Sequence, residues 1–176
     1  MTFYEVLGLE PKLTLDPADL QKRFYARSRQ WHPDKFSRAS AVEQQKALDQ
    51  TALLNDAFRT LRDPVARAEY VLDQHKVHAS KAPPPELLEE VFELNMALEE
   101  LRQGDESARG QLTESRGKFV HMLTEVDHGL TVMAAKYDGG HDESLLSAIR
   151  SVLDRRRYIS NLLRDVNKEL HVDLSN

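Results

Sequence analysis

An imidazole and a carboxylate, two groups that could do chemistry together, stand two positions apart as His32 and Asp34, with Pro33 between them. A histidine beside a carboxylate can transfer protons, so the pair is compatible with general acid–base catalysis. The carboxylate can also accept a charge-assisted hydrogen bond from an arginine of a partner protein. Catalysis of the first kind needs a concave, desolvated site. The elements around the tripeptide therefore decide between the two alternatives.

A helix is predicted to lead into the tripeptide. Asp16 and Pro17 are the residue types favoured at the N-cap and at the first helical position. Pro33 disfavours helical backbone at His32, so the helix is expected to end near Trp31. At about 100° per residue, its apolar face is formed by Leu20, Phe24 and Trp31.

Cations occupy the other sides of this predicted helix. Lys22 and Arg29 lie opposite the apolar face, and Arg23 lies to one side. Arg27 falls within the apolar face, where we expect its aliphatic stem to pack and its guanidinium to remain in water. Lys35 follows the tripeptide and adds a further positive charge.

A second long helix is predicted to return over residues 41–62, and Asp63-Pro64 is expected to open a short helix that runs to about His75. A short helix over residues 2–8 is expected to stop near Gly8. The predicted core positions of the return helix are Leu48, Leu54, Phe58 and Leu61. Two antiparallel helices with a short turn place the tripeptide at an exposed, convex tip, which disfavours a small hydrolase that uses His32 and Asp34.

These features resemble a J-domain, whose signature is the His-Pro-Asp tripeptide. Residues 3–9 (FYEVLGL) are similar to the opening of J-domains, and residues 54–64 (LNDAFRTLRDP) are similar to their third helix and its end. The resemblance implies a 70-kDa heat-shock ATPase of the DnaK/HscA class as the partner, whose ATP hydrolysis the docked J-domain speeds. The chaperone-binding residues that it implies are Lys22, Arg23, Arg29, His32, Pro33, Asp34 and Lys35.

The rest of the chain is predicted to be a proline-rich junction over residues 76–85, with Lys81 and three consecutive prolines, and a helical bundle over residues 86–176. Gly104 and Gly139-Gly140 divide the second region into three segments. Their apolar stripes are Leu87, Val91, Leu94, Leu98 and Leu101; Leu112, Phe119, Leu123, Val126, Leu130, Met133 and Tyr137; and Leu145, Ile149, Val152, Ile159, Leu163, Val166 and Leu170, with Arg116 and Arg156 as interruptions. The predicted fold is therefore all-α, a J-domain hairpin (1–75) followed by an up-down-up three-helix bundle.

An apolar triplet falls outside the first of these stripes. Leu88, Phe92 and Met96 lie roughly 100–180° from it on a helix. Carboxylates rim the triplet, namely Glu89, Glu93 and Glu100. An outward apolar patch of this kind predicts a docking surface for a partner protein, although cover by another helix is an alternative. Tyr158 also falls off its stripe, among arginines, and is predicted to extend the patch.

Residues 67–72 (RAEYVL) and the order of the two predicted domains resemble HscB, the J-protein family of iron–sulfur cluster assembly. The resemblance implies that the bundle binds the cluster scaffold protein IscU and that HscA is the chaperone served. The scaffold-binding residues that it implies are Leu88, Phe92, Glu93, Met96, Glu100 and Tyr158. Met96 departs from the family, whose members can have a carboxylate there. Because the chain lacks the N-terminal Cys-pair module of eukaryotic relatives, it is expected to be of the bacterial type.

Composition excludes several other classes of function. The net charge of −5 and the absence of a basic face over a whole domain argue against a nucleic-acid-binding module. The chain has no cysteine, and neither the pair His75 and His78 nor the pair His121 and His128 completes a convincing metal-ligand set, so we expect no metal and no cofactor. No Gly-rich phosphate loop is present. The absence of an apolar span and a helical pattern that starts almost at Met1 lead us to expect a cytoplasmic protein.

The sequence thus predicts a non-enzymatic co-chaperone that presents IscU to HscA and triggers ATP hydrolysis there. The nearest alternative is a J-domain co-chaperone of a DnaK-class chaperone that serves another client.

Overall fold

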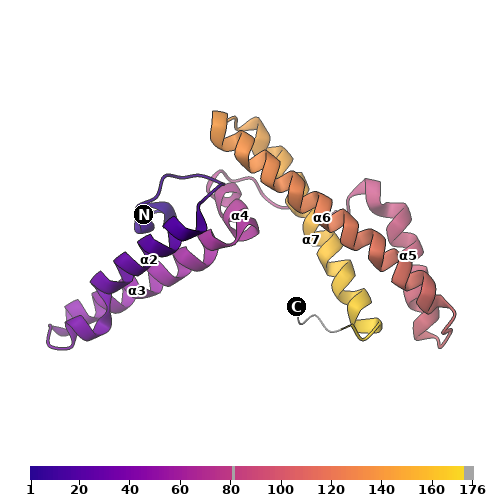
Figure 1. The fold of residues 1–176 in the computed structure, drawn as a ribbon, viewed down its shortest axis with the longest axis horizontal. Coiled ribbons are helices and arrows are strands. Elements are labelled where there is room, and N and C mark those ends of the chain that lie inside the picture. The colour runs from indigo at the N-terminus through magenta and orange to yellow at the C-terminus, as the bar shows by residue number, and fades with distance from the viewer. Residues whose placement is uncertain (81, 173–176) are drawn as a thin grey trace. The chain divides into compact units, whose positions relative to one another are not determined.

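The computed structural model describes residues 1–80 and 82–172, and these residues form helices, turns and loops with no strand (Figure 1). Lys81 in the predicted junction and residues 173–176 at the end of the predicted bundle lie outside this description. The all-α prediction is confirmed. No helix within the described ranges is long and apolar enough to cross a membrane.

The first part of the chain contains four α-helices and the one-turn 3-10 helix η1: α1 (Phe3–Leu7), α2 (Pro17–Trp31), η1 (Pro33–Phe36), α3 (Ala41–Arg62) and α4 (Pro64–Gln74). The predicted start signals operate as expected, because the Asp16 carboxylate accepts from Ala18 N and the Asp63 carboxylate accepts from Ala66 N. Helix α1 ends at Gly8, which adopts the left-handed conformation at φ 68°.

Helices α2 and α3 lie side by side as an antiparallel hairpin (Figure 1). Leu20, Leu54 and Leu61 are buried, and the rings of Phe24 and Phe58 are stacked with their centroids 4.3 Å apart. The prediction that Leu48 belongs to this core is wrong, because its side chain is exposed. The inward stripe of α3 instead passes through the adjacent position, Ala47, which is fully buried and small enough for close helix approach.

The second part of the chain contains the 3-10 helix η2 (Pro85–Leu87) and the α-helices α5 (Leu88–Arg102), α6 (Ala108–Gly140) and α7 (Ser144–Glu169). One apolar cluster joins all three α-helices; its buried members include Leu94, Phe119 and Ile159. The two arginines that interrupt the predicted stripes have polar partners. Arg116 Nε donates to Asn167 Oδ1 at 2.5 Å, and Arg156 forms an ion pair with Asp127 at 2.5 Å.

The chain divides into two compact units, and each unit is made of two segments that are not continuous in sequence. The first unit comprises residues 1–76 together with 134–141, the last turns of α6. The second unit comprises residues 77–133 and 142–176, of which the structure describes 77–80, 82–133 and 142–172. The inclusion of 134–141 in the first unit was not predicted from the sequence.

Candidate functional site

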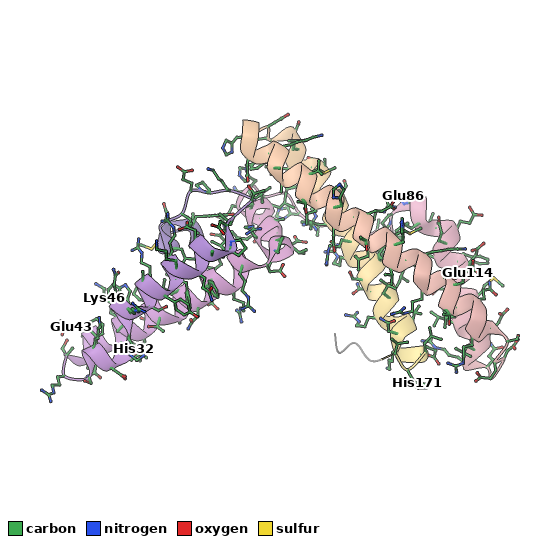
Figure 2. The ribbon with its side chains drawn as sticks, viewed as in Figure 1. His32, Glu43, Lys46, Glu86, Glu114 and His171 are labelled. Carbon is green, nitrogen blue, oxygen red and sulfur yellow. The ribbon has the colours of Figure 1, made fainter. Side chains whose placement is uncertain are left out.

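The tripeptide His32-Pro33-Asp34 lies at the tip of the hairpin, where α2 ends and η1 begins (Figure 2). His32 has extended backbone at φ −60° and ψ 126°, as expected for a residue before proline. Its Nδ1 atom accepts from Asp34 N at 3.3 Å, which places the histidine ring at the N-terminus of η1. The side chains of His32 and Asp34 are 58% and 89% exposed. A carboxylate so open to water lacks the desolvation that acid–base catalysis requires, but it can reach a partner protein.

Contacts from α3 brace the tip. The Thr51 hydroxyl lies 3.0 Å from the carbonyl oxygen of Trp31 and 2.8 Å from that of Ala47, so it shares its one proton between them. The Lys46 ammonium lies 5.8 Å from the centre of the Trp31 ring. Ser40 caps α3, and the Glu43 carboxylate accepts from both the hydroxyl and the backbone amide of Ser40. These hydrogen bonds from Ser40 hold the pKa of Glu43 below its usual range.

The predicted basic face of α2 is exposed at Lys22 and Arg29. Arg23 is also exposed, but it forms an ion pair with Asp19 at 2.7 Å and donates to the carbonyl of Gly8. Arg23 therefore also links α2 to the end of α1.

Tyr25 is an exposed aromatic residue that the sequence analysis did not select. It stands three positions after Lys22 and four before Arg29, so the three side chains share one face of α2. That spacing is the sequence signal by which Tyr25 could have been found.

Arg27, whose aliphatic stem was expected to pack against the apolar face, is exposed, and its guanidinium lies next to Gly8.

In the second unit, Leu88, Phe92 and Met96 on α5 are 54%, 65% and 48% exposed. Adjacent glutamates, including Glu93 and Glu100, are exposed as well. Single exposed apolar residues are common, but three on one helix face form an apolar surface with an acidic rim.

Tyr158 lies on α7 in a different environment. It is partly buried and packs against the core cluster of the bundle. It also lines a cavity of about 310 Å³ together with Ser80, Asp154 and Arg157. Its exposed part is therefore smaller than that of the α5 residues.

One of the four histidines that the sequence analysis considered as metal ligands, His121, lies next to a single carboxylate. His121 Nδ1 lies 3.7 Å from a carboxylate oxygen of Glu125, one turn away on α6. Within residues 1–80 and 82–172, no group of three or more histidine and acidic side chains is arranged to hold a metal ion.

Comparison with known proteins places these features in a class. Residues 2–70 match the DnaJ domain family. The fold is similar to that of the chaperone HscB from Vibrio cholerae, with a TM-score of 0.67, 28% sequence identity, and 96% of each chain covered. It is also similar to the human co-chaperone protein HscB, with a TM-score of 0.63 and 21% identity over 96% of this chain and 82% of that one.

The exposed His-Pro-Asp tip on a helical hairpin and the DnaJ match together define a J-domain protein. The structural similarity extends beyond this domain, because the match to HscB from Vibrio cholerae covers 96% of the chain. The chain therefore contains a DnaJ domain at residues 2–70, and its fold as a whole is similar to that of HscB.

Proposed function

We propose that this protein docks on a 70-kDa heat-shock ATPase through the tip and basic face of its first unit and stimulates ATP hydrolysis by that chaperone. The observation that carries the proposal is the exposure of His32 and Asp34 at the end of a helix that displays Lys22 and Arg29. Exposed cations attract an acidic partner surface and speed the encounter. One oxygen of the Asp34 carboxylate lies 3.5 Å from His32 Nδ1, but the side chain is 89% exposed and can then accept hydrogen bonds from a partner arginine.

Stimulation requires more than attachment. A docked protein shifts its partner toward the hydrolysis-competent state only if it binds that state better than the resting state. We propose that the tip residues His32, Pro33, Asp34 and Lys35 supply this preference, and that Lys22, Arg23 and Arg29 supply the encounter. The ATP chemistry belongs to the chaperone, so the protein itself is not an enzyme and needs no cofactor.

We propose that the second unit binds the iron–sulfur cluster scaffold IscU. The exposed α5 surface of Leu88, Phe92 and Met96 supports this role, because an apolar centre with a polar rim is the usual anatomy of a docking surface. Glu93 and Glu100 are assigned to the rim. Met96 replaces a carboxylate found in some HscB proteins, and its flexible thioether can pack on an apolar partner. Tyr158 is the weakest member of the set because it is partly buried.

In this proposal residues 1–75 form the chaperone-binding domain, 76–85 the junction and 86–176 the scaffold-binding domain. The protein thereby delivers IscU to HscA in the cytoplasm. The alternative is that the same J-domain serves a DnaK-class chaperone with another client.

One assay separates these possibilities. The steady-state ATPase rates of HscA and of DnaK are measured with and without this protein, each in the presence and absence of IscU. The proposal predicts that the greatest stimulation is seen with HscA when IscU is present. Equal stimulation of DnaK without any effect of IscU would favour the alternative, and no stimulation of either chaperone would remove the proposal.

A further inference from the structure

A carboxylate from the last turn of α6 holds the loop between α1 and α2. Asp138 Oδ1 accepts from Leu13 N at 2.7 Å, and Asp138 Oδ2 accepts from Thr14 N at 2.7 Å. The Thr14 hydroxyl also donates to Asp138 Oδ2. Leu13 and Asp138 are 125 positions apart in sequence, but both belong to the first unit. A carboxylate that accepts two backbone amides and a hydroxyl fixes the loop more firmly than one neutral bond does.

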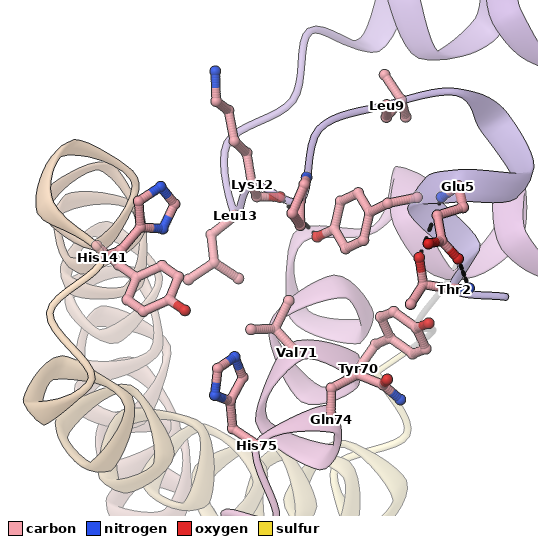
Figure 3. A pocket seen from close by; sticks show the side chains of 13 residues that line it. Thr2, Glu5, Leu9, Lys12, Leu13, Tyr70, Val71, Gln74, His75 and His141 are labelled. Atoms are coloured by element: carbon pink, nitrogen blue, oxygen red, sulfur yellow. Dashed lines mark hydrogen bonds between the residues drawn. The ribbon is translucent and has the colours of Figure 1, made fainter.

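Apolar contacts accompany this clamp. Leu13 is buried, and it lines a cavity of about 340 Å³ together with Val71 and Tyr137. Figure 3 shows Leu13 and Val71 among the side chains that line this cavity. Tyr137 is buried on the same helical turn as Asp138. Residues 134–141 thus contribute both a polar anchor and apolar contact to the unit that carries the His-Pro-Asp tip.

The other side of the loop is held from within residues 1–76. The Tyr4 hydroxyl donates to the carbonyl of Lys12 at 2.7 Å. Burial raises the pKa of Tyr4, so the hydroxyl keeps its proton and remains a donor. Arg23 donates to the carbonyl of Gly8 at the start of the loop. Of these anchors, only the Asp138 carboxylate comes from outside residues 1–76.

The clamp lies immediately before α2. Thr14 is two residues from Asp16, which caps α2 at Ala18 N, and Leu20 N donates to the carbonyl of Asp16 at 3.0 Å. A residue that fixes Thr14 therefore restrains the first turn of the helix that displays Lys22 and Arg29. We propose that Asp138 is a positioning residue for chaperone docking, which acts through Thr14 and the N-terminus of α2. This inference rests on the proposed function for its effect on the chaperone but not for the clamp itself.

The first arm of the test needs no chaperone. Amide hydrogen exchange is compared in the full-length protein, Asp138→Ala, Asp138→Asn and the control Glu143→Ala, which removes an exposed carboxylate that makes no capping bond. We expect the Leu13 and Thr14 amides of Asp138→Ala to exchange at least about tenfold faster, which corresponds to about 1.4 kcal/mol of lost local protection. Asp138→Asn keeps an acceptor and is expected to lie between Asp138→Ala and the unmodified protein. Unchanged exchange at both amides in Asp138→Ala would overturn the clamp.

The second arm titrates each variant into the ATPase assay. A loosened α2 is oriented for docking only part of the time, and the apparent affinity falls by that fraction. We therefore expect the half-maximal concentration to rise severalfold for Asp138→Ala while the maximal stimulation, which depends on the intact tip, stays the same. Glu143→Ala is expected to match the unmodified protein.

The outcomes are distinguishable. Faster exchange with an unchanged titration curve would show that Asp138 is structural only and would overturn its positioning role. Loss of the folded first unit in both Asp138 variants would also contradict that role, because it would indicate a requirement for folding. If the unmodified protein stimulates no chaperone, the proposed function fails, and the positioning role with it, while hydrogen exchange still reports on the clamp.

Discussion

The ring of Trp31 stacks on the ring of Phe36 across the base of the His32–Lys35 turn, with the ring planes within 8° of parallel and the centroids 5.9 Å apart. Trp31 ends α2 and Phe36 ends η1, so the stack joins the two ends of the segment that carries the His-Pro-Asp tripeptide. The exposed tip is therefore not a free loop. Its backbone is held by an aromatic pair below it while its polar side chains face water.

The stack leads to a prediction for Phe36→Ala. Its loss should lower the free energy of unfolding by about 1 kcal/mol and reduce the maximal stimulation of the chaperone, because the tripeptide no longer has one orientation. The matched control is Phe3→Ala, which removes a ring stacked on Tyr70 with centroids 4.6 Å apart in the same unit. Thermal unfolding and ATPase stimulation are measured for both. Equal stimulation by the two variants would show that the stack does not order the tip.

Electrostatic steering predicts that association with the chaperone slows as salt rises, because exposed charges are screened over about 10 Å at 0.1 M salt. Arg29→Glu should reduce the association rate more than it raises the dissociation rate. Arg164→Glu on α7 changes the net charge equally and is the control, with little effect expected. Stopped-flow or surface-binding kinetics at several salt concentrations provide the measurement. An association rate insensitive to both salt and Arg29→Glu would count against steering.

Phe92→Ala should weaken the binding of IscU without lowering the thermal stability of the protein. Truncation of a central apolar contact costs about 2 kcal/mol or more, roughly thirtyfold in the dissociation constant. Because Phe92 is 65% exposed, the melting temperature should barely change. Truncation of Glu93 or of Glu100, at the rim of the patch, should reduce the affinity for IscU by less than Phe92→Ala does. In the absence of IscU, Phe92→Ala should stimulate the chaperone as well as the unmodified protein does.

Titration calorimetry with IscU and thermal melting test the Phe92 prediction together. Val120→Ala truncates another exposed apolar side chain of the second unit and is the control. If Phe92→Ala binds IscU as tightly as Val120→Ala does, the docking surface has been assigned to the wrong face.

Acid should loosen the start of α3 through Glu43. Hydrogen bonds from Ser40 lower the pKa of Glu43 in the folded protein, so the contribution of this group to stability is fully present above the ordinary pKa of a glutamate, about 4.3. It is lost as pH falls through the lower, folded pKa. Glu43→Gln should remove this part of the pH dependence. Exchange of the α3 first-turn amides between pH 5 and 3 is the measurement, and identical profiles would contradict the assignment.

The helices and the tip could be predicted because local signals specify them. Asp16-Pro17 and Asp63-Pro64 begin helices in the structure, as their residue types predict, and α2 ends just before His32-Pro33. Leu48 was wrongly predicted to be buried, because a helical stripe identified from large apolar residues misses a small buried residue next to it. Ala47, not Leu48, faces inward.

The Asp138 clamp could not be predicted, because no local pattern pairs a carboxylate with backbone amides more than a hundred positions away in the chain. The same holds for Arg23, whose bond to the Gly8 carbonyl depends on how α1 and α2 pack. Tyr158 fell off its stripe in sequence, but the core of the bundle accommodates part of its ring. Tertiary packing decided all three positions.

The most direct test of the account is the His32→Gln variant in the ATPase assay with HscA and IscU, compared with His128→Gln, the same change at an exposed histidine of the second unit. His32 lies at an exposed tip, so both variants should fold and melt like the unmodified protein. We expect His32→Gln to abolish stimulation and His128→Gln to leave it unchanged. Full stimulation by a folded His32→Gln protein would contradict this expectation.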